Sequence, residues 1–367
     1  MTYTCREVIE AIEAVAPPYL AEENDRIGLQ IGRPDQEVSR VLVSLEVTRE
    51  VLEEAQVRRA QLIVSHHPLI WQPLAQIRED DPAGALVAEL LRRRISVYVA
   101  HTNWDRCAEG VSACLARALG LERTEVLEEA EGSFSYKLVT FVPEGHEAAV
   151  IEALAQAGAG RIGAYRHCSF RSLGIGTFRP LKGASPFLGK VGQKEEVREY
   201  RLEMVVPRPA LAAALSALRR AHPYEEPAYD VYPLAAGSAG AGLGVVGELA
   251  AAVPLEELAE RLKRLLGTER VRVAGPVFRQ VRRLAVIGGS GGGLVAKAVQ
   301  RGAEALVTGD VKHHEVLNAL AWGLAVIDAG HGATERVSLP QLAEWLRSSL
   351  PGLEVWVSTS ADPWQYV

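Results

Sequence analysis

Short apolar runs alternate with amphipathic stretches along the first hundred residues, and each apolar run ends in polar residues. After Thr4, apolar positions recur at helical spacing up to Val15, which predicts an amphipathic helix capped by Thr4. A strand over 41–47, a helix over 48–59 and a buried strand that ends near Ser65 follow. This order predicts a right-handed βαβ unit and therefore an α/β fold.

A second unit of the same kind appears late in the chain. It consists of a strand over 283–287, a glycine-rich turn over 288–293, a helix over 294–301 and a strand over 305–307. Four positions of the two units correspond, namely Val43 with Val286, Ala60 with Ala303, Val64 with Val307 and Ser65 with Thr308. We therefore predict two related α/β halves that face each other across one site and form one domain.

Between these halves lies a segment with its own internal repeat. Tyr136, Leu138, Val142-Pro143, Ala148-Ala149, Ala153-Leu154 and Tyr165 recur at one fixed offset as Tyr200, Leu202, Val206-Pro207, Ala212-Ala213, Ala217-Leu218 and Tyr229. Two βαβ copies of this kind predict a ferredoxin-like α+β insert over 133–236. The insert interrupts a domain made of 1–132 and 237–367, and a Gly/Ala/Ser-rich linker over 235–242 marks its end.

Composition narrows the function classes. The chain has 367 residues and a net charge of -6 without basic blocks, which argues against binding to a nucleic-acid backbone. No signal peptide and no run of membrane-spanning length are present, so we expect a soluble, cytoplasmic protein without a membrane partner. The four cysteines form no close pair and are expected to be reduced packing residues, with a ligand role for Cys107 as the minority interpretation.

Candidate metal ligands follow three predicted strands. His66-His67-Pro68 ends the first, and Pro68 prevents the strand from continuing. His101 and Asp105 follow the second strand, while His331 and Glu335 follow the third and would share one helix face. Adjacent histidines diverge on an extended chain, so His66 and His67 can serve two neighbouring ions. Because buried imidazoles and carboxylates are costly without a cation or a catalytic task, we predict a metal site.

Three further features leave alternatives open. Asp25 is either a partner of a site residue or a loop cap. The glycine-rich turn over 288–293 either holds a phosphate or makes a tight turn, because it lacks the Lys-Ser/Thr ending of a nucleotide-binding loop. Of His313 and His314, which follow Asp310, one is expected to donate a proton or to support a ligand and the other to face solvent.

These motifs together resemble the dinuclear-metal family known as GTP cyclohydrolase 1 type 2 homologues. The residues that carry the resemblance are Ser65-His66-His67-Pro68-Leu69, His101-Thr102-Asn103-Trp104-Asp105, Thr308-Gly309-Asp310 with His313, and Asp328-Ala329-Gly330-His331 with Glu335. The resemblance spans the whole chain, because the long bacterial members carry an insert similar to the PII and CutA regulators. The run from His222 to Tyr229 is similar to the signature of that insert.

The resemblance implies a role for each site residue. His66 and His67 would each bind one of two divalent ions, Asp105 the first and His331 the second, and Glu335 would bridge both. His101 would be a ligand or a base, and His101 or His313 would move protons. The ions are Zn, Mn, Fe, Co or Ni, which these ligands do not distinguish. Members of the family form toroidal homohexamers, so self-association is also expected.

The implied function is that of a metal-dependent hydrolase, a GTP cyclohydrolase that opens the imidazole ring of guanine and releases formate. The residues by themselves indicate only metal-assisted hydrolysis of a small, anionic substrate. The alternatives are another two-metal hydrolase, such as a phosphoesterase, and a non-enzymatic regulatory protein whose oligomer is braced by metal. The chain departs from the family pattern at Asn24-Asp25-Arg26, where Trp-Asp-Asn is expected, and at Glu46, where Asp is usual. These changes spare the ligands and alter the substrate pocket.

Overall fold

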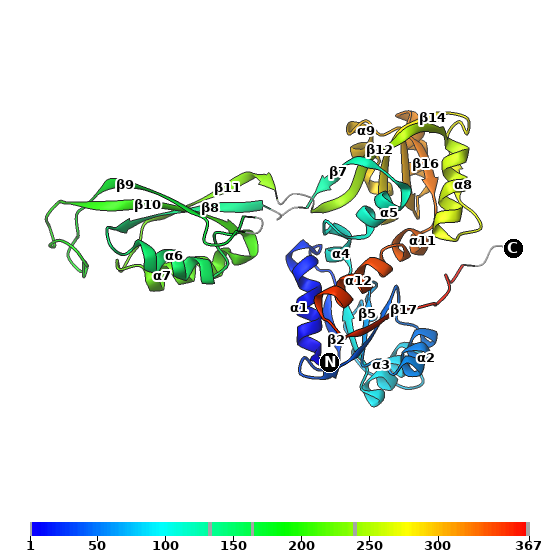
Figure 1. Cartoon of the computed structure of the whole chain (residues 1–367), viewed down its shortest axis with the longest axis horizontal. Helices are drawn as coiled ribbons and strands as arrows, with labels where there is room; N and C mark the ends of the chain where they lie inside the picture. Colours follow the sequence, from blue (N-terminus) through cyan, green and yellow to red (C-terminus); the bar gives the residue numbers. More distant parts are fainter. Residues whose placement is uncertain (1, 131–133, 163–164, 238–240, 365–367) are drawn as a thin grey trace. The chain divides into compact units, whose positions relative to one another are not determined.

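The computed structural model describes residues 2–130, 134–162, 165–237 and 241–364. The chain divides into two compact units, one made of Met1–Ala130 with Gly240–Val367 and the other of Glu131–Ala239. The second unit, which we call the insert, is described separately below (Figure 1). Among the described residues, none of the helices combines the length and the apolar character needed to cross a membrane.

The first half of the larger unit is built on a five-stranded sheet in the order β17-β4-β5-β6-β2. Its strands β17, β4, β5 and β6 are parallel, and β2 is antiparallel to β6. The strands are β2 (Gly28–Ile31), β4 (Arg40–Ser44), β5 (Leu62–Ser65), β6 (Ser96–Val99) and β17 (Glu354–Val357). The short strands β1 (Tyr3–Thr4) and β3 (Glu37–Val38) pair with each other. The chain's last strand thus completes the sheet of its first half.

Helices cover both faces of this sheet because alternate strand residues are apolar on both sides. Val41 and Val43 pack with α1 and α12, while Leu42 packs with α2 and α3. These helices are α1 (Cys5–Val15), α2 (Arg49–Arg58), α3 (Pro82–Arg93) and α12 (Leu339–Ser349). Thr4 caps α1 in a reciprocal capping box with Glu7, as the sequence predicts.

The second half is built on a six-stranded sheet in the order β13-β16-β15-β14-β12-β7. Its strands are β7 (Glu122–Glu129), β12 (Gly242–Pro254), β13 (Arg272–Ala274), β14 (Gln280–Ser290), β15 (Ala305–Gly309) and β16 (Ala325–Asp328). The helices of this half and of its connections are α4 (Thr102–Arg106), α5 (Val111–Leu119), α8 (Leu255–Leu266), η3 (Gly292–Leu294), α9 (Val295–Gln300), α10 (His313–Ala321) and α11 (His331–Arg336). The short helix η1 (Pro18–Leu20) belongs to the first half. The central strands β14, β15 and β16 are parallel.

The two halves share their central topology. Each has three adjacent parallel strands joined by helices, β4-α2-β5-α3-β6 in the first half and β14-α9-β15-α10-β16 in the second. The register repeats as well, because Val43 pairs with Val64 and Val286 pairs with Val307. These are the positions that the sequence comparison matched, so the two halves agree in strand register there. That the halves are related stays a prediction.

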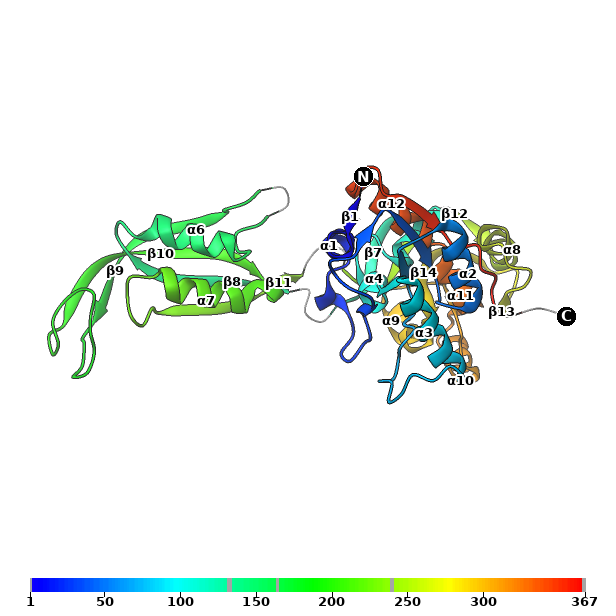
Figure 2. The ribbon, with the colours of Figure 1, turned by 90° about the horizontal axis from the view of Figure 1, so that it is seen from below.

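The insert has an antiparallel sheet in the order β11-β8-β10-β9. Its elements are β8 (Phe134–Pro143), α6 (Glu147–Gln156), β9 (Ser169–Phe178), β10 (Glu195–Pro207), η2 (Arg208–Ala210), α7 (Leu211–Ala221) and β11 (Tyr229–Gly237). Helices α6 and α7 lie side by side on one face of the sheet (Figures 1 and 2). Leu202, Met204 and Val206 of β10 pack against them.

The extended region expected around Tyr165 is shorter than the repeat suggests. Tyr165 forms a single bridge with Ile162, and β9 begins only at Ser169. His167 has a φ of 57°, and Cys168 donates its backbone N–H to the carbonyl of Gly160. This left-handed turn interrupts the extended chain, whereas Tyr229, the matching position of the second copy, does begin a strand.

Candidate metal centre

His66 and His67 extend the end of β5. Their backbone N–H groups donate to the carbonyls of Ser44 and Leu45, at 3.0 and 2.8 Å, so the parallel pairing with the β4 side continues beyond the strand. The two rings are tilted by 46° to each other, and their centroids are 5.0 Å apart. Each imidazole can therefore reach a different neighbour across the site.

His101 and Asp105 come from the segment that follows β6. His101 lies at the start of α4, and Asp105 lies in its first turn. Trp104 anchors this helix, because its indole Nε1 donates to the hydroxyl of Ser338 at 3.1 Å in the core. Asn103 also holds the helix, through a hydrogen bond of 2.6 Å to the carbonyl of Ala16. The positions of both candidate ligands are thus determined by packing between distant segments.

His331 and Glu335 follow β16. Gly330 has a φ of 89°, which turns the chain from the strand into α11. One helical turn separates the two side chains, as the sequence predicts, and His331 Nε2 lies 3.0 Å from Glu335 Oε1. Burial of Glu335, whose side chain is 5% exposed, places its carboxylate inside the site.

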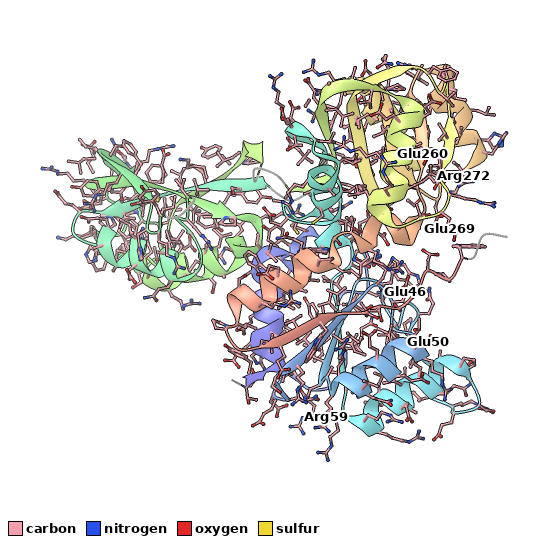
Figure 3. The ribbon with its side chains drawn as sticks, turned by 45° about the vertical axis from the view of Figure 1, so that its right-hand side comes forward. Glu46, Glu50, Arg59, Glu260, Glu269 and Arg272 are labelled. Atoms are coloured by element: carbon pink, nitrogen blue, oxygen red, sulfur yellow. The ribbon has the colours of Figure 1, made fainter. Side chains whose placement is uncertain are left out.

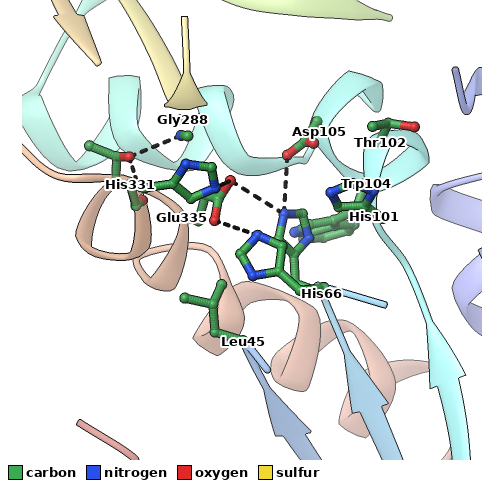
Figure 4. A network of polar contacts seen from close by, with 12 residues as sticks. Leu45, His66, His101, Thr102, Trp104, Asp105, Gly288, His331 and Glu335 are labelled. Carbon is green, nitrogen blue, oxygen red and sulfur yellow. Dashed lines mark hydrogen bonds and ion pairs between the residues drawn. The ribbon is translucent and has the colours of Figure 1, made fainter. Parts of the chain in front are cut away.

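All of these side chains converge on the carboxylate of Glu335 (Figure 4). Its Oε2 lies 3.1 Å from His67 Nε2, and its Oε1 lies 3.7 Å from His66 Nε2. His66 Nε2 also lies 3.5 Å from Asp105 Oδ1. Ligand atoms come within 4.8 Å of one another in three groups: His66 with Asp105 and Glu335, His67 with His331 and Glu335, and His66 with His67 and His101. The described residues thus bring together every ligand that the sequence predicted.

The outer nitrogen of each imidazole has a partner of its own. His66 Nδ1 lies 2.9 Å from the carbonyl oxygen of Ala100, and His67 Nδ1 lies 3.4 Å from Glu46. His101 Nδ1 lies 2.8 Å from Asp25, and His331 Nδ1 lies 3.0 Å from Asp310. A partner on Nδ1 determines the tautomer and the ring orientation, and leaves Nε2 to face the centre. The four rings are therefore oriented before any ligand binds.

The negative charge of buried carboxylates dominates the electrostatics of the site. Burial would raise the pKa of Glu335, but the nearby imidazoles of His331, His66 and His67 together outweigh it and hold that pKa well below the ordinary value. Burial raises the pKa of Asp105 to about 6. The pKa of His67 is lowered by burial and raised more strongly by Glu335 and Glu46, to about 10. The carboxylates thus draw cationic charge into the site.

A divalent cation fits this donor set. His66 Nε2, Asp105 Oδ1 and Glu335 Oε2 are buried and have no hydrogen-bond partner among the described residues. Buried polar atoms without partners are rare, and their presence in one place calls for a ligand. Imidazole nitrogens and carboxylate oxygens suit the transition metals and zinc, and the partners on Nδ1 are those typical of metal-binding histidines.

Three supporting residues were missed or left undecided by sequence reasoning. Asp25, which also accepts from the backbone N–H and hydroxyl of Thr102, is a partner of His101 and not only a loop cap. Glu46, labelled in Figure 3, and Asp310 support His67 and His331. Each of these carboxylates lies in a loop or just after a strand. The spacing of residues in the sequence does not show which histidine ring each carboxylate contacts.

Two other candidates lie outside the cluster. His313 is exposed at the start of α10, with its ring against that of His314 at 5.5 Å, and it belongs to none of the three ligand groups. A proton-transfer role for His313 stays a prediction. Burial raises the pKa of Cys107 to about 12, and its thiol donates to the carbonyl of Trp104, which supports a packing role.

The glycine-rich turn packs against the site. The N–H groups of Gly288 and Gly289 donate to Ser112 and Thr334, at 3.3 and 3.0 Å, so they are engaged within the protein. Gly289 has a φ of +65°, and a Cβ placed there would lie 2.3 Å from Glu335 Oε1. The glycine is therefore needed for the close approach of the backbone to the carboxylate, which favours the tight-turn interpretation.

Residues 3–363 match the family described as Duf34/NIF3 (NGG1p interacting factor 3). The chain belongs to the Duf34/NIF3 family. A Bacillus subtilis relative named GTP cyclohydrolase 1 type 2 homolog is 41% identical, over 99% of this chain and 98% of the relative. A Mycobacterium tuberculosis relative with the same name is 40% identical, over 99% of this chain and 97% of the relative.

Two solved structures agree with this assignment. A Bacillus cereus protein related to NIF3 is 39% identical, with a TM-score of 0.82 over 100% of this chain and 99% of the other. A Staphylococcus aureus protein is 30% identical, with a TM-score of 0.81 over the same shares of the two chains. The mixed α/β fold with several sheets is thus the fold of solved NIF3 structures.

Proposed function

We propose that this Duf34/NIF3 chain is a dinuclear metal-dependent hydrolase, and that it opens the imidazole ring of guanine in GTP with release of formate. The observation that supports the proposal is the sharing of one buried carboxylate, that of Glu335, by three imidazoles. A carboxylate has two oxygens and can bridge two ions. The name of the 40–41% identical relatives suggests the substrate.

Two sets of ligands meet at Glu335. His66 and Asp105 would hold one ion with it, and His67 and His331 would hold the other. Two such ions would lower the pKa of water and would polarise the bond to be cleaved.

The chain's own residues supply proton transfer and substrate orientation. His101 donates from Nδ1 to Asp25, so its Nε2 lone pair faces the centre and can take a proton from water and return it to the leaving nitrogen. Trp71 lies edge-on to His101 at 6.1 Å and is half exposed, which offers an aromatic surface for a purine ring beside the site. His331 is 35% exposed, so substrate can approach on this side.

The test is formate release from GTP by protein loaded separately with Zn, Mn, Fe or Co. The variant Glu335→Gln removes the shared charge, and Glu344→Gln, an exposed position on α12, is the matched control. We expect sustained formate release from the wild type and the control and none from Glu335→Gln. Protein that binds two ions per chain and releases no formate with any of the four metals would refute the cyclohydrolase proposal; release of phosphate instead would identify a phosphoesterase.

We further propose that the insert is a ferredoxin-like domain of the PII/CutA type. The element order β8-α6-β9-β10-α7-β11 and the strand order β11-β8-β10-β9 support this. Assembly into a homohexamer stays a prediction from the family resemblance, and sedimentation equilibrium of the full-length chain measures it directly.

A further inference from the structure

The insert contains a cavity of about 640 Å³ that belongs to neither ligand group of the metal centre. It lies on the sheet face opposite α6 and α7. Leu202 of β10 points to the helices, so its neighbour Arg201 and the residue Glu199 point to the opposite face, where they line the cavity. The segment between β9 and β10 and the loop before β11 supply the remaining walls.

Glycines on β9 keep the floor of this cavity open. Gly174 pairs with Glu199 across the sheet, and a Cβ placed on Gly174 would have no atom nearer than 3.9 Å. A Cβ on Gly176 would lie 1.9 Å from Glu199 Oε2. The carboxylate of Glu199 therefore extends over Gly176, into space that the side chain of any larger residue at position 176 would fill.

Glu199 is the distinctive polar group of the cavity. The residue is 7% exposed, and its Oε1 accepts a hydrogen bond of 2.7 Å from the hydroxyl of Tyr224. In the described part of the insert it forms no ion pair with a Lys, Arg or His side chain. A buried carboxylate without a cation is costly, and donors from a ligand would offset that cost.

Of the other charged groups of the lining, Arg201 and Glu225 are engaged within the protein, whereas Arg179 and Glu226 are exposed. Arg201 donates to Glu203 at 2.9 Å and lies over the ring of Phe141 at 6.0 Å. Glu225 accepts from the backbone N–H of Ser185 at 2.9 Å, which ties the two covering loops together. Glu199 is thus a buried carboxylate of the lining whose Oε2 is left to accept, while its Oε1, which accepts from Tyr224, keeps a second lone pair for another donor.

Aromatic rings form the walls beside this carboxylate. The ring of Tyr224 lies 5.9 Å from that of Phe178 and 6.4 Å from that of Phe187, centroid to centroid. Walls of this kind suit a flat aromatic ring, which can stack or meet them edge-on. A positive charge on such a ring would also interact favourably with the aromatic faces.

We infer that this cavity binds a flat aromatic ligand that presents two adjacent N–H donors, an amidine-type edge, to the carboxylate of Glu199. Two parallel N–H···O bonds to one carboxylate combine charge with fixed geometry. A ligand of the same shape with a carbonyl oxygen in place of one donor would direct that oxygen at the carboxylate and be rejected. The site is separate from the proposed hydrolase chemistry and does not depend on it.

The probes are benzamidine, which has this edge, and benzamide, which has the same shape with one oxygen. Binding to the full-length chain is measured by saturation-transfer NMR titration, and hydrogen exchange with mass spectrometry locates it. We expect benzamidine to bind at least ~10-fold more tightly than benzamide, because one charge-assisted hydrogen bond is lost. Protection should appear in the peptides that cover 172–188.

Three variants test the assignment. Glu199→Gln should reduce benzamidine affinity at least ~10-fold, and Glu196→Gln, whose side chain on the same strand is 64% exposed, should leave it unchanged. Gly174→Val places bulk on the cavity floor without altering the carboxylate and should also weaken binding. Equal affinity for the two probes, or benzamidine binding that survives both Glu199→Gln and Gly174→Val in folded protein, would overturn the inference.

Discussion

Gly289→Ala tests the metal centre without changing any proposed ligand. The added methyl would lie 2.3 Å from Glu335 Oε1 and 3.2 Å from its carboxyl carbon, whereas ordinary contact begins at 3.4 Å. Since buried imidazoles surround Glu335, the carboxylate must move by about 1 Å, several times the tolerance of about 0.2 Å for a metal–ligand bond. We therefore expect the affinity for divalent ions to fall by ~10–100-fold or more.

The assay is a competition titration with a chromophoric chelator, together with the metal content per chain by mass spectrometry. A second effect has to be separated from the first, because Gly289 has a φ of +65° and alanine at that φ is strained by about 1–2 kcal/mol. Urea unfolding measures this loss of stability independently of metal binding.

Gly267→Ala is the matched control. Gly267 ends α8 with the same φ of +65°, and a Cβ there would meet nothing within 4 Å. Both variants carry the same backbone strain, and Gly289→Ala should lose further stability through the clash with Glu335; only Gly289→Ala should lose metal. If Gly289→Ala binds ions as tightly as Gly267→Ala does, Glu335 is not held in place by its neighbours and the proposed bridging role is wrong.

Three further predictions concern residues that support the site or the insert. Asp25→Asn should lower the rate of formate release by ~10–100-fold and leave the metal content per chain unchanged, because an amide orients the His101 ring less firmly than a carboxylate; an unchanged rate would contradict this. Trp104→Phe should lower the free energy of unfolding by about 1–3 kcal/mol, since it removes a buried hydrogen bond to Ser338 and leaves a cavity, and an unchanged urea midpoint would refute it. Burial lowers the pKa of His222, and both of its ring nitrogens form hydrogen bonds with backbone groups. The contribution of the neutral His222 ring to the free energy of unfolding is therefore complete above the unfolded pKa of 6.5 and is lost as the pH falls below that value. The His222→Asn variant should lose this dependence in pH-resolved hydrogen exchange of the insert.

The local sequence determined the helices and strands and the types of side chain that are candidates for metal ligands. The βαβ pattern was readable because strands buried on both faces are continuous apolar runs, and Val43 with Val64 and Val286 with Val307 proved to share one register. The spacing of His331 and Glu335 was readable for a similar reason, since one helical turn is a local property. Around Tyr165, which the repeat matches with Tyr229, the extended region is limited to one bridge, because a single left-handed turn at His167 delays β9.

Tertiary structure decided which atoms meet. Nothing local places the carboxylate of Glu335 beside His66 and His67, because these residues follow strands of different sheets. Asp25 likewise reaches the outer nitrogen of His101 only through the packing of segments that are distant in the sequence. The same holds for the insert, where Glu199 lies buried over Gly176 through the pairing of β9 with β10. Periodicity along the chain tells which side of a strand or helix a residue occupies, whereas contacts between distant segments depend on the packing of the whole unit.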